Sequence, residues 1–367
     1  LSKDKFEFSV ISTHNNNLDI LKRMGIKCFY FKKTLVDKIH STLVLSELFY
    51  KLIARFKFLS PFEKKIKSIK CDLVYFVAPT STMSILQSLN YIATVWDSSH
   101  RDSPEFDELR IFGEFRKREY IYKNYLSQAF LVLVDSEISK QSVHYRYGLD
   151  KEKTIVMPFS PNPLMEIDEK KSIQEIIKKY NLKKDYLFYP AQFWSHKNHL
   201  RVLQALKILK QKNIFINIVF SGGTPSNSNG YFDKVLKFVD ENNLNNQVSI
   251  LGFIPANEIS AIYEASKAVI FPSYLGPTNI PPLEAWLYKK PLLCSELHKE
   301  QVGKGAILFN PDDAEDIVRS IMQLKNEKVL KILLTEAKKQ IQLINEKRKV
   351  SELILISKLN SYKLRLE

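Results

Sequence analysis

Short apolar runs alternate with longer amphipathic stretches throughout the second half of the chain. The runs predict β-strands at Tyr186–Ala191, Ile214–Phe220, Val248–Leu251, Ala268–Phe271, Pro291–Cys294 and Ala306–Phe309. The stretches between them predict helices at about 198–211, 231–242, 256–266 and 281–288. Such alternation is typical of a parallel sheet that helices cover on both faces. Because right-handed crossovers bring the carboxyl ends of parallel strands to one edge, we expect the functional turns there.

The first half shows the same alternation less clearly. It predicts strands at Phe6–Ile11, Ile26–Phe31, Asp72–Ala78, Tyr91–Trp96, Phe130–Val134 and Thr154–Met157. Helices are expected at about 18–24, 35–70 and 107–126, and from a Ser136 cap to about Tyr147. From about Pro311 the chain is predicted to be helical to its end, with a lysine-rich polar face.

The length of 367 residues predicts two domains, because it exceeds one typical hydrophobic core. Prolines at 158, 161 and 163 interrupt the pattern and mark a linker. We therefore expect a first α/β domain at 1–160, a linker at 161–170, a second α/β domain at 171–325 and C-terminal helices at 326–367 that partly pack back on the first domain. Two such domains enclose a cleft, where substrates usually bind.

The formal net charge of +15 suggests an anionic partner: nucleic acid, an anionic membrane surface or a phosphate-bearing substrate. No nucleic-acid-binding motif is recognisable, so we expect no nucleic acid. Basic residues crowd the stretch 35–70, at Lys51, Arg55, Lys57, Lys64, Lys65, Lys67 and Lys70. Two interpretations remain open, a face that rests on anionic lipid and a core-facing amphipathic helix with a solvated side.

Three widely spaced cysteines, Cys28, Cys71 and Cys294, are typical of core thiols in a reducing cytoplasm. No apolar run approaches the ~20 residues of a membrane-spanning helix. We therefore expect a cytoplasmic protein, peripheral at most at the inner face of the cytoplasmic membrane. Leu1 opens the chain like the end of a helix, and we expect the natural N-terminus to precede it.

The stretch FPSYLGPTNIPPLEAW, residues 271–286, joins a strand end to a helix start. Two prolines mark the first helical turn, and Thr278 or Asn279 is the expected N-cap. Backbone N–H groups and the positive end of the helix dipole would point at one spot, which predicts an anion site. Glu284 lies just inside the helix, where it could accept hydrogen bonds from sugar hydroxyls. The alternative is an ordinary strand–helix turn with a solvated Glu284.

The turn YPAQFWSHKNH, residues 189–199, gathers Gln192, His196, Lys197 and Asn198 where a strand passes into a helix. A lysine near a helix start is repelled by the helix dipole, an arrangement that makes sense if an anion lies between them. The alternative is a solvent-exposed basic turn.

Three other turns carry weaker signals. Gly222 and Gly223 permit close backbone approach, but a glycine pair alone is weak evidence. Phe253 and Ile254 follow a strand where an aromatic ring could be sandwiched. In the first half, Asp97, His100, Arg101 and Asp102 gather just past a strand's carboxyl end, the edge at which α/β sheets bind ligands.

Together these motifs resemble a retaining glycosyltransferase of family 4, with the GT-B fold. The resemblance covers about residues 70–320 and rests on segments in matching order: Gln192–Lys197–Asn198, Gly222–Gly223, ILGFIPANEISAIYEASKAVIFPS, PTNIPPLEA, PLLCSE and LFNPDD. DSSHRDSPEF and VDSEISK are similar to first-domain segments of that family. PTNIPPLEA and YPAQFWSHKNH together resemble bacterial enzymes that build surface polysaccharide such as O-antigen or capsule.

The resemblance implies two Rossmann-like domains that face each other across a cleft. The second would bind a nucleotide-diphosphate sugar, UDP- or GDP-linked, and the first a glycan or lipid-linked acceptor. Lys197 would bind the diphosphate, Gln192 would replace the family's frequent Arg, and Glu284 would bind the ribose. The remaining donor-side residues would be the glycine pair Gly222 and Gly223, then Phe253 and Ile254, which would flank the base. The N–H groups of Thr278, Asn279 and Ile280 would cradle phosphate or sugar.

From the opposite domain, the resemblance implies that His100 reaches the donor sugar or the developing charge, with Asp97 as an acceptor-side candidate. The chain departs from the family pattern in three places. Gly276 stands where the family commonly has the first of two glutamates, with Glu284 as the second. Trp96-Asp97 replaces a His-Asp pair, and the N-terminal glycine-rich loop is not in this chain.

The expected reaction is hexosyl transfer with retention of the anomeric configuration. No covalent nucleophile is evident in the sequence, and we expect neither a metal nor a cofactor. No Asp-x-Asp motif stands out on a strand end, so Lys197, the helix start and turn amides would stabilise the leaving diphosphate. Alternatives are a non-catalytic GT-B scaffold subunit, a sugar-nucleotide epimerase on the same fold, and a charge-driven nucleic-acid or membrane-surface module.

Overall fold

The computed structural model describes residues 6–15, 18–43, 55, 59–161, 171–224 and 229–366. The chain forms two compact units. The first comprises Leu1–Trp96, Arg116–Met157 and Val350–Glu367, and the second comprises Asp97–Phe115 and Pro158–Lys349. The expected contiguous first domain, 1–160, is therefore wrong in one respect, because Asp97–Phe115 packs with the second unit. Most of the predicted linker, 161–170, lies outside the described residues.

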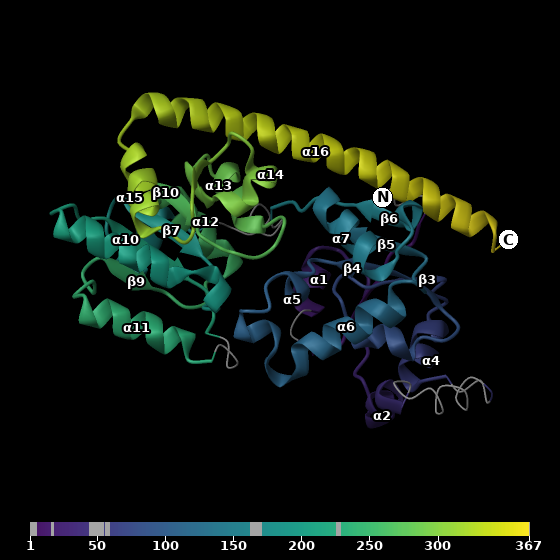
Figure 1. Cartoon of the computed structure of the whole chain (residues 1–367). Helices are drawn as coiled ribbons and strands as arrows, with labels where there is room; N and C mark the ends of the chain where they lie inside the picture. The colour runs from purple at the N-terminus through teal and green to yellow at the C-terminus, as the bar shows by residue number, and fades with distance from the viewer. Residues whose placement is uncertain are drawn as a thin grey trace. The chain divides into compact units, whose positions relative to one another are not determined.

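The second unit contains a six-stranded sheet in the order β12-β11-β10-β7-β8-β9 (Figure 1). Every pair that the strands form is parallel, as the alternation predicted. The strands are β7 (Tyr186–Pro190), β8 (Asn217–Ser221), β9 (Val248–Ile250), β10 (Ala268–Phe271), β11 (Leu292–Ser295) and β12 (Ile307–Phe309). The chain adds β8 and β9 on one side of β7, then returns to add β10 on the other. The strand order thus reverses between β7 and β10, and such switch points open a crevice at the carboxyl edge.

Helices complete the second unit. Among the described residues they are α5 (Ser99–Asp102), α9 (Ile173–Lys179), α10 (His199–Gln211), α11 (Tyr231–Glu241), α12 (Ala256–Ala265), α13 (Ile280–Leu287), α14 (Lys299–Val302) and α15 (Ala314–Gln323). The helix α16 (Glu327–Leu364) follows and continues into the first unit. Phe188 of β7, Leu206 of α10 and Ile270 of β10 are fully buried members of one continuous core. That core gives the carboxyl-edge turns a rigid base.

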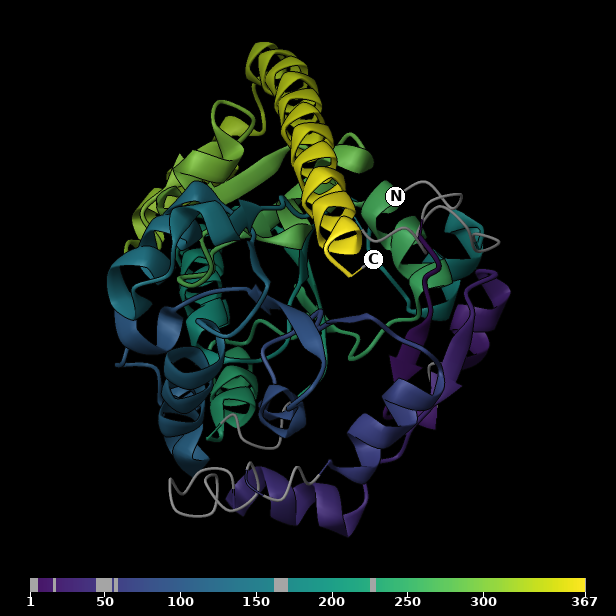
Figure 2. The same cartoon turned by 90° about the vertical axis from the view of Figure 1, so that its right-hand side faces the viewer.

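The first unit contains a parallel sheet in the order β3-β4-β5-β6 and a separate parallel pair, β1-β2. The strands are β1 (Val10–Ser12), β2 (Cys28–Tyr30), β3 (Leu73–Tyr75), β4 (Asn90–Val95), β5 (Leu131–Val134) and β6 (Thr154–Val156). On one sheet face, Leu359 of α16 joins Ile92 and Leu133 in a small core. Figure 2 shows the last turns of α16 in front of this sheet. The predicted return of the C-terminal helix to the first domain is thus visible within this unit.

Helices of the first unit are α1 (Leu18–Arg23), α2 (Leu35–Leu43), α4 (Pro61–Ser68), α6 (Glu114–Tyr125) and α7 (Glu137–Tyr147). Ser136 caps α7 as predicted, since its Oγ accepts the N–H of Ser139. The expected helix 107–126 begins only at Glu114. The reason is that Phe112 and Gly113 have left-handed φ angles of 52° and 74°, which a continuous helix excludes.

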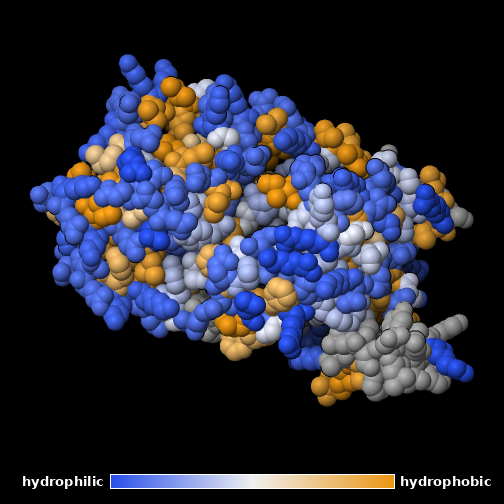
Figure 3. Space-filling model, viewed as in Figure 1, coloured by the Kyte–Doolittle hydropathy of each residue, from blue (hydrophilic) through white to orange (hydrophobic). Residues whose placement is uncertain are grey.

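Part of the basic stretch 35–70 can be placed. α4 buries Phe62 and Ile66 against the core and leaves Lys64 and Lys65 exposed. The described part therefore has the form of a core-facing amphipathic helix with a solvated side, whereas Lys51 and Lys57 lie outside the described residues. Among the residues that the structure describes, no helix is long and apolar enough to cross a bilayer. On the face shown in Figure 3, hydrophilic residues predominate and apolar ones occur in small groups.

The central strand supports a test of the core. Phe188 is fully buried and its ring meets that of Tyr263 edge-on, with centroids 4.8 Å apart. Phe188→Ala should lower the free energy of unfolding by about 3–5 kcal/mol, because it removes buried area and leaves a cavity. Phe215→Ala is the matched control, since Phe215 is 65% exposed. Urea unfolding checks this, and equal effects of the two substitutions would contradict the placement of Phe188.

Candidate functional site

Lys197 lies at the switch point between β7 and β10. It ends a 3₁₀ turn, Ser195–Lys197, that links β7 to α10. Its Nζ is 3.4 Å from Oγ of Ser273, which follows β10, and 5.6 Å from the centroid of the Phe271 ring. The carbonyl oxygen of Lys197 accepts a 2.7 Å hydrogen bond from the hydroxyl of buried Tyr189. The ammonium group therefore lies between the turn that follows β7 and the turn that follows β10.

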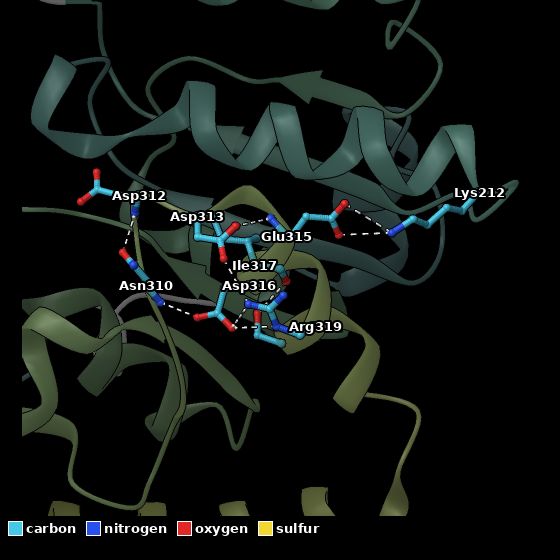
Figure 4. A network of polar contacts seen from close by, with 9 residues as sticks. Lys212, Asn310, Asp312, Asp313, Glu315, Asp316, Ile317 and Arg319 are labelled. Carbon is cyan, nitrogen blue, oxygen red and sulfur yellow. Dashed lines mark hydrogen bonds and ion pairs between the residues drawn. The ribbon is translucent and has the colours of Figure 1, made fainter.

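Asn198 fixes the backbone just after Lys197. Its φ of 59° is left-handed, a conformation that asparagine tolerates better than most residues. Its side-chain amide donates to the carbonyl oxygen of Pro311 at 2.8 Å. The segment beyond Pro311 is itself held by the start of α15, where Asp313 accepts the N–H of Glu315 and an ion pair with Arg319 closes the turn. Figure 4 shows this network, which extends to an ion pair between Lys212 and Glu315.

Burial dominates the electrostatics of Lys197. It lowers the pKa of the ammonium to about 8, while the negative charges of Asp97 and Glu108 oppose that shift. Lys197 is thus largely charged at neutral pH but lacks the hydration of a surface lysine. An anion bound beside it would stabilise the charged form.

Gly222 is required for the approach of two turns, and Gly223 is not. A Cβ on Gly222 would lie 2.2 Å from the carbonyl oxygen of Ala191, and φ is +150°. The N–H of Gly222 also donates to the carbonyl oxygen of Gly252 at 2.8 Å. A Cβ on Gly223 would meet no atom within 4 Å. The predicted pair therefore divides into one packing residue and one residue with open space around it.

The start of α13 differs from the predicted cradle. Asn279 occupies the N-cap position, but its side chain makes no capping bond and instead donates to the carbonyl oxygen of Gly276 at 3.1 Å. The N–H of Asn279 is also engaged, because it donates to Oε1 of Gln301 at 2.9 Å. The prolines at 281 and 282 have no N–H group, so neither they nor Asn279 can offer a backbone amide to a ligand. Asn279 therefore does not supply the expected capping side chain.

Glu284 extends the site along α13. One of its carboxylate oxygens accepts a 2.7 Å hydrogen bond from the hydroxyl of Tyr263, whose ring stacks on that of Tyr288 with centroids 5.3 Å apart. Burial raises the pKa of Glu284, and the bond from Tyr263 opposes the shift. This bond orients the carboxylate, which has further lone pairs for ligand hydroxyls.

Three predicted donor-side residues have unlike surroundings. Gln192 is exposed, and its side-chain oxygen accepts a 2.9 Å bond from the indole of Trp194. Phe253 is 81% exposed and has the freedom to stack on a ring. Ile254 is only 6% exposed and packs in the hydrophobic core. The predicted place of Phe253 and Ile254 on either side of a base therefore stays a prediction, with the Ile254 side chain already packed in the core.

Asp97 and His100 lie in a segment that packs with the second unit. Oδ1 of Asp97 accepts the N–H of Ser99 at 2.8 Å, and the negative charge of Asp97 reaches Lys197. His100 is fully buried, with its ring edge-on to that of Phe115. The contact of His100 with a donor sugar stays a prediction, whereas its assignment to the opposite domain is wrong, because its segment packs with the second unit.

Several residues of the site escaped sequence reasoning. Ser273, Tyr263 and Gln301 each bond to a predicted site residue. Glu108 binds the turn before Lys197 although 88 positions separate it from His196. A single Glu within a predicted helix carries no sequence signal, so only the folded chain identifies Glu108.

The glycine pair provides an internal test. Gly222→Ala should destabilise the second unit by several kcal/mol, because its Cβ would overlap the Ala191 carbonyl group. Gly223→Ala should change stability by less than about 0.5 kcal/mol. Thermal unfolding of both variants measures the difference, and an unaffected Gly222→Ala protein would refute the close approach of the two turns.

Residues 171–350 match the model of the family described as glycosyl transferases group 1. Over 198 residues the chain is 26% identical to the O-antigen chain mannosyltransferase RfbU of Salmonella typhimurium, covering 53% of this chain and 51% of that protein. It is 24% identical over 205 residues to the O-antigen chain mannosyltransferase B of Escherichia coli, covering 54% and 52%. The chain therefore spans about half the length of these curated relatives.

Solved structures show the fold. The Anabaena protein HepE in complex with UDP-glucose aligns with a TM-score of 0.69 at 16% identity, covering 95% of this chain and 89% of that one. A glycosyltransferase from Rickettsia africae aligns with a TM-score of 0.65, also at 16% identity, covering 94% and 89%. The fold is that of the GT-B glycosyltransferases, with Rossmann-like parallel sheets in both units, as predicted.

Proposed function

We propose that the chain is a retaining glycosyltransferase of family 4 that transfers a hexose from a nucleotide-diphosphate sugar to a glycan or lipid-linked acceptor. The observation that carries this proposal is the position of Lys197 beside Ser273 at the β7/β10 switch point. A half-buried lysine at this edge suits the diphosphate of a donor. Glu284, oriented by Tyr263, suits the ribose hydroxyls.

In the proposed reaction, the bond from the anomeric carbon to the diphosphate breaks while the acceptor oxygen bonds to the same face of that carbon. The departing phosphate oxygen takes the acceptor's proton, so no carboxylate base is assigned at Gly276. Lys197 and the positive end of the α13 dipole stabilise the charge that builds on the diphosphate. This proposal assigns no role to a metal ion or to a cofactor.

The relatives support a biological setting. Both curated relatives named above are O-antigen mannosyltransferases, and HepE was solved with UDP-glucose. We therefore propose a role in bacterial surface-polysaccharide synthesis, at the cytoplasmic side of the membrane that carries lipid-linked acceptors. GDP-mannose and UDP-glucose are the donors to test first.

Turnover decides between this proposal and a non-catalytic scaffold. The chain should hydrolyse or transfer sugar from GDP-mannose or UDP-glucose when given lipid-linked acceptor extracts, and radiolabelled sugar transfer measures this. Nuclear magnetic resonance of the product should show that the anomeric configuration is retained. Nucleotide binding without turnover across donors and acceptors would favour the scaffold, and an inverted product would refute retention.

Lys197 should control binding of the diphosphate. Lys197→Ala should weaken GDP or UDP binding about 10- to 100-fold, the usual value of a charge-assisted hydrogen bond, whereas Lys207→Ala on the exposed side of α10 should not. Wild-type affinity should also fall as the pH rises above about 8, because the pKa of Lys197 is about 8 and only the ammonium form attracts the anion. Calorimetry at about pH 7 and pH 9.5 measures both effects, and a pH-independent affinity would contradict this role.

A further inference from the structure

Three successive residues of the Asp97–Phe115 segment, here called the crossing segment, contact separate turns of the second unit. The ring of Phe106 lies against His196 and Tyr274, with centroids 6.1 and 5.4 Å away. Asp107 accepts a 2.7 Å bond from the Asn229 side chain. Glu108 binds the turn that ends at Lys197. The crossing segment thus reaches the turns after β7, β8 and β10 together.

Glu108 makes the densest of these contacts. Its carboxylate accepts hydrogen bonds from the Ser195 hydroxyl at 2.7 Å, the His196 N–H at 3.0 Å and Nδ1 of His196 at 2.6 Å. The Glu108 side chain is 7% exposed, so water competes little for these bonds. One carboxylate therefore holds both the side chains and the backbone at the start of the turn.

The surroundings of Glu108 and His196 determine the protonation state of each. Hydrogen bonds from His196 and Ser195 outweigh burial and hold the pKa of Glu108 at about 2. Burial lowers the pKa of His196, which is therefore neutral at pH 7 and donates its Nδ1–H to the carboxylate. Glu108 consequently keeps its full negative charge close to Lys197 across the physiological pH range.

We propose that Glu108 is a positioning residue for Lys197, and that Phe106, Asp107 and Glu108 support the turns of the donor site. By fixing Ser195 and His196, Glu108 places the ammonium of the next residue beside Ser273. Its negative charge also favours the charged form of that lysine. Glu108 touches neither donor nor acceptor in this scheme. The donor-binding part of the inference rests on the function proposed above.

Other titratable groups also face Lys197. Asp97 lies on the crossing segment, His196 and His199 flank Lys197 in its own turn and helix, and buried His298 lies beneath the turn after β10. Of these, only Asp97 adds negative charge. Removal of the Glu108 charge should therefore lower the pKa of Lys197, whereas a purely structural clasp would leave that pKa unchanged.

The first test is a double-mutant cycle on nucleotide binding. Glu108→Gln should raise the Kd for GDP or UDP about tenfold, because the turn loses a charged acceptor. The matched control is Glu105→Gln, an exposed Glu of the same segment, which should leave Kd unchanged. Added to Lys197→Ala, Glu108→Gln should cost little more, since it acts through the lysine. Additive losses would overturn the proposal.

The second test needs no nucleotide. The pH dependence of Lys197 acylation by acetic anhydride, followed by mass spectrometry, reports its pKa in the ligand-free protein. The midpoint should move to lower pH in Glu108→Gln but not in Glu105→Gln, and equal midpoints would overturn the proposal. If wild type binds neither GDP nor UDP, the proposed function fails while this titration still decides the role of Glu108. Should Glu108→Gln not fold, Ser195→Ala serves instead in the nucleotide-binding test, because it removes one bond between Glu108 and the turn. Its Kd should rise by less than about tenfold, and an unchanged Kd would contradict the proposal.

Discussion

Burial of the Lys197 ammonium is the constraint on which the site depends. An amino group removed from water loses hydration free energy, which is why its pKa falls to about 8. Three features offset part of this cost because they stabilise the ammonium form: the Ser273 hydroxyl, the aromatic face of Phe271 and the nearby charges of Asp97 and Glu108. None of them neutralises the ammonium at contact distance. An anion bound there, as proposed, would offset the cost that burial imposes on the ammonium form.

The strand and helix pattern of the second unit was predictable because each element is buried on a regular period. Phe188, Val219 and Ile270 lie in continuous apolar runs, as strands covered on both faces require. The predicted elements of the first half were less accurate. Its long helix at 107–126 was misplaced because the interruption depends on left-handed angles at Phe112 and Gly113, and a phenylalanine gives no local sign of such a conformation.

Site residues were predictable where the chemistry is local and hidden where it depends on distant contacts. Lys197 lies on a strand–helix turn, and Glu284 lies just inside the helix that follows another such turn. Topology alone therefore places both residues at the carboxyl edge of the sheet. The sequence cannot separate Gly222 from Gly223, because only the position of the Ala191 carbonyl group makes one of them obligatory. Asparagine is a common N-cap residue, but the side chain of Asn279 donates to the carbonyl oxygen of Gly276 and its N–H donates to Gln301.

Two features decide where negative charge lies around Lys197: the glycine at position 276, where the family commonly has a glutamate, and Glu108, which the sequence did not predict. A carboxylate in the loop after β10 would place negative charge where the diphosphate is proposed to bind, and Gly276 has φ of +92°, which favours glycine. Glu108 and Asp97 instead supply their charge from the crossing segment. Glu108 is directed into the Ser195–Lys197 turn by its hydrogen bonds, so its lone pairs are occupied by the protein itself. Negative charge placed behind a lysine supports the ammonium form without competing for the face that an anion would use.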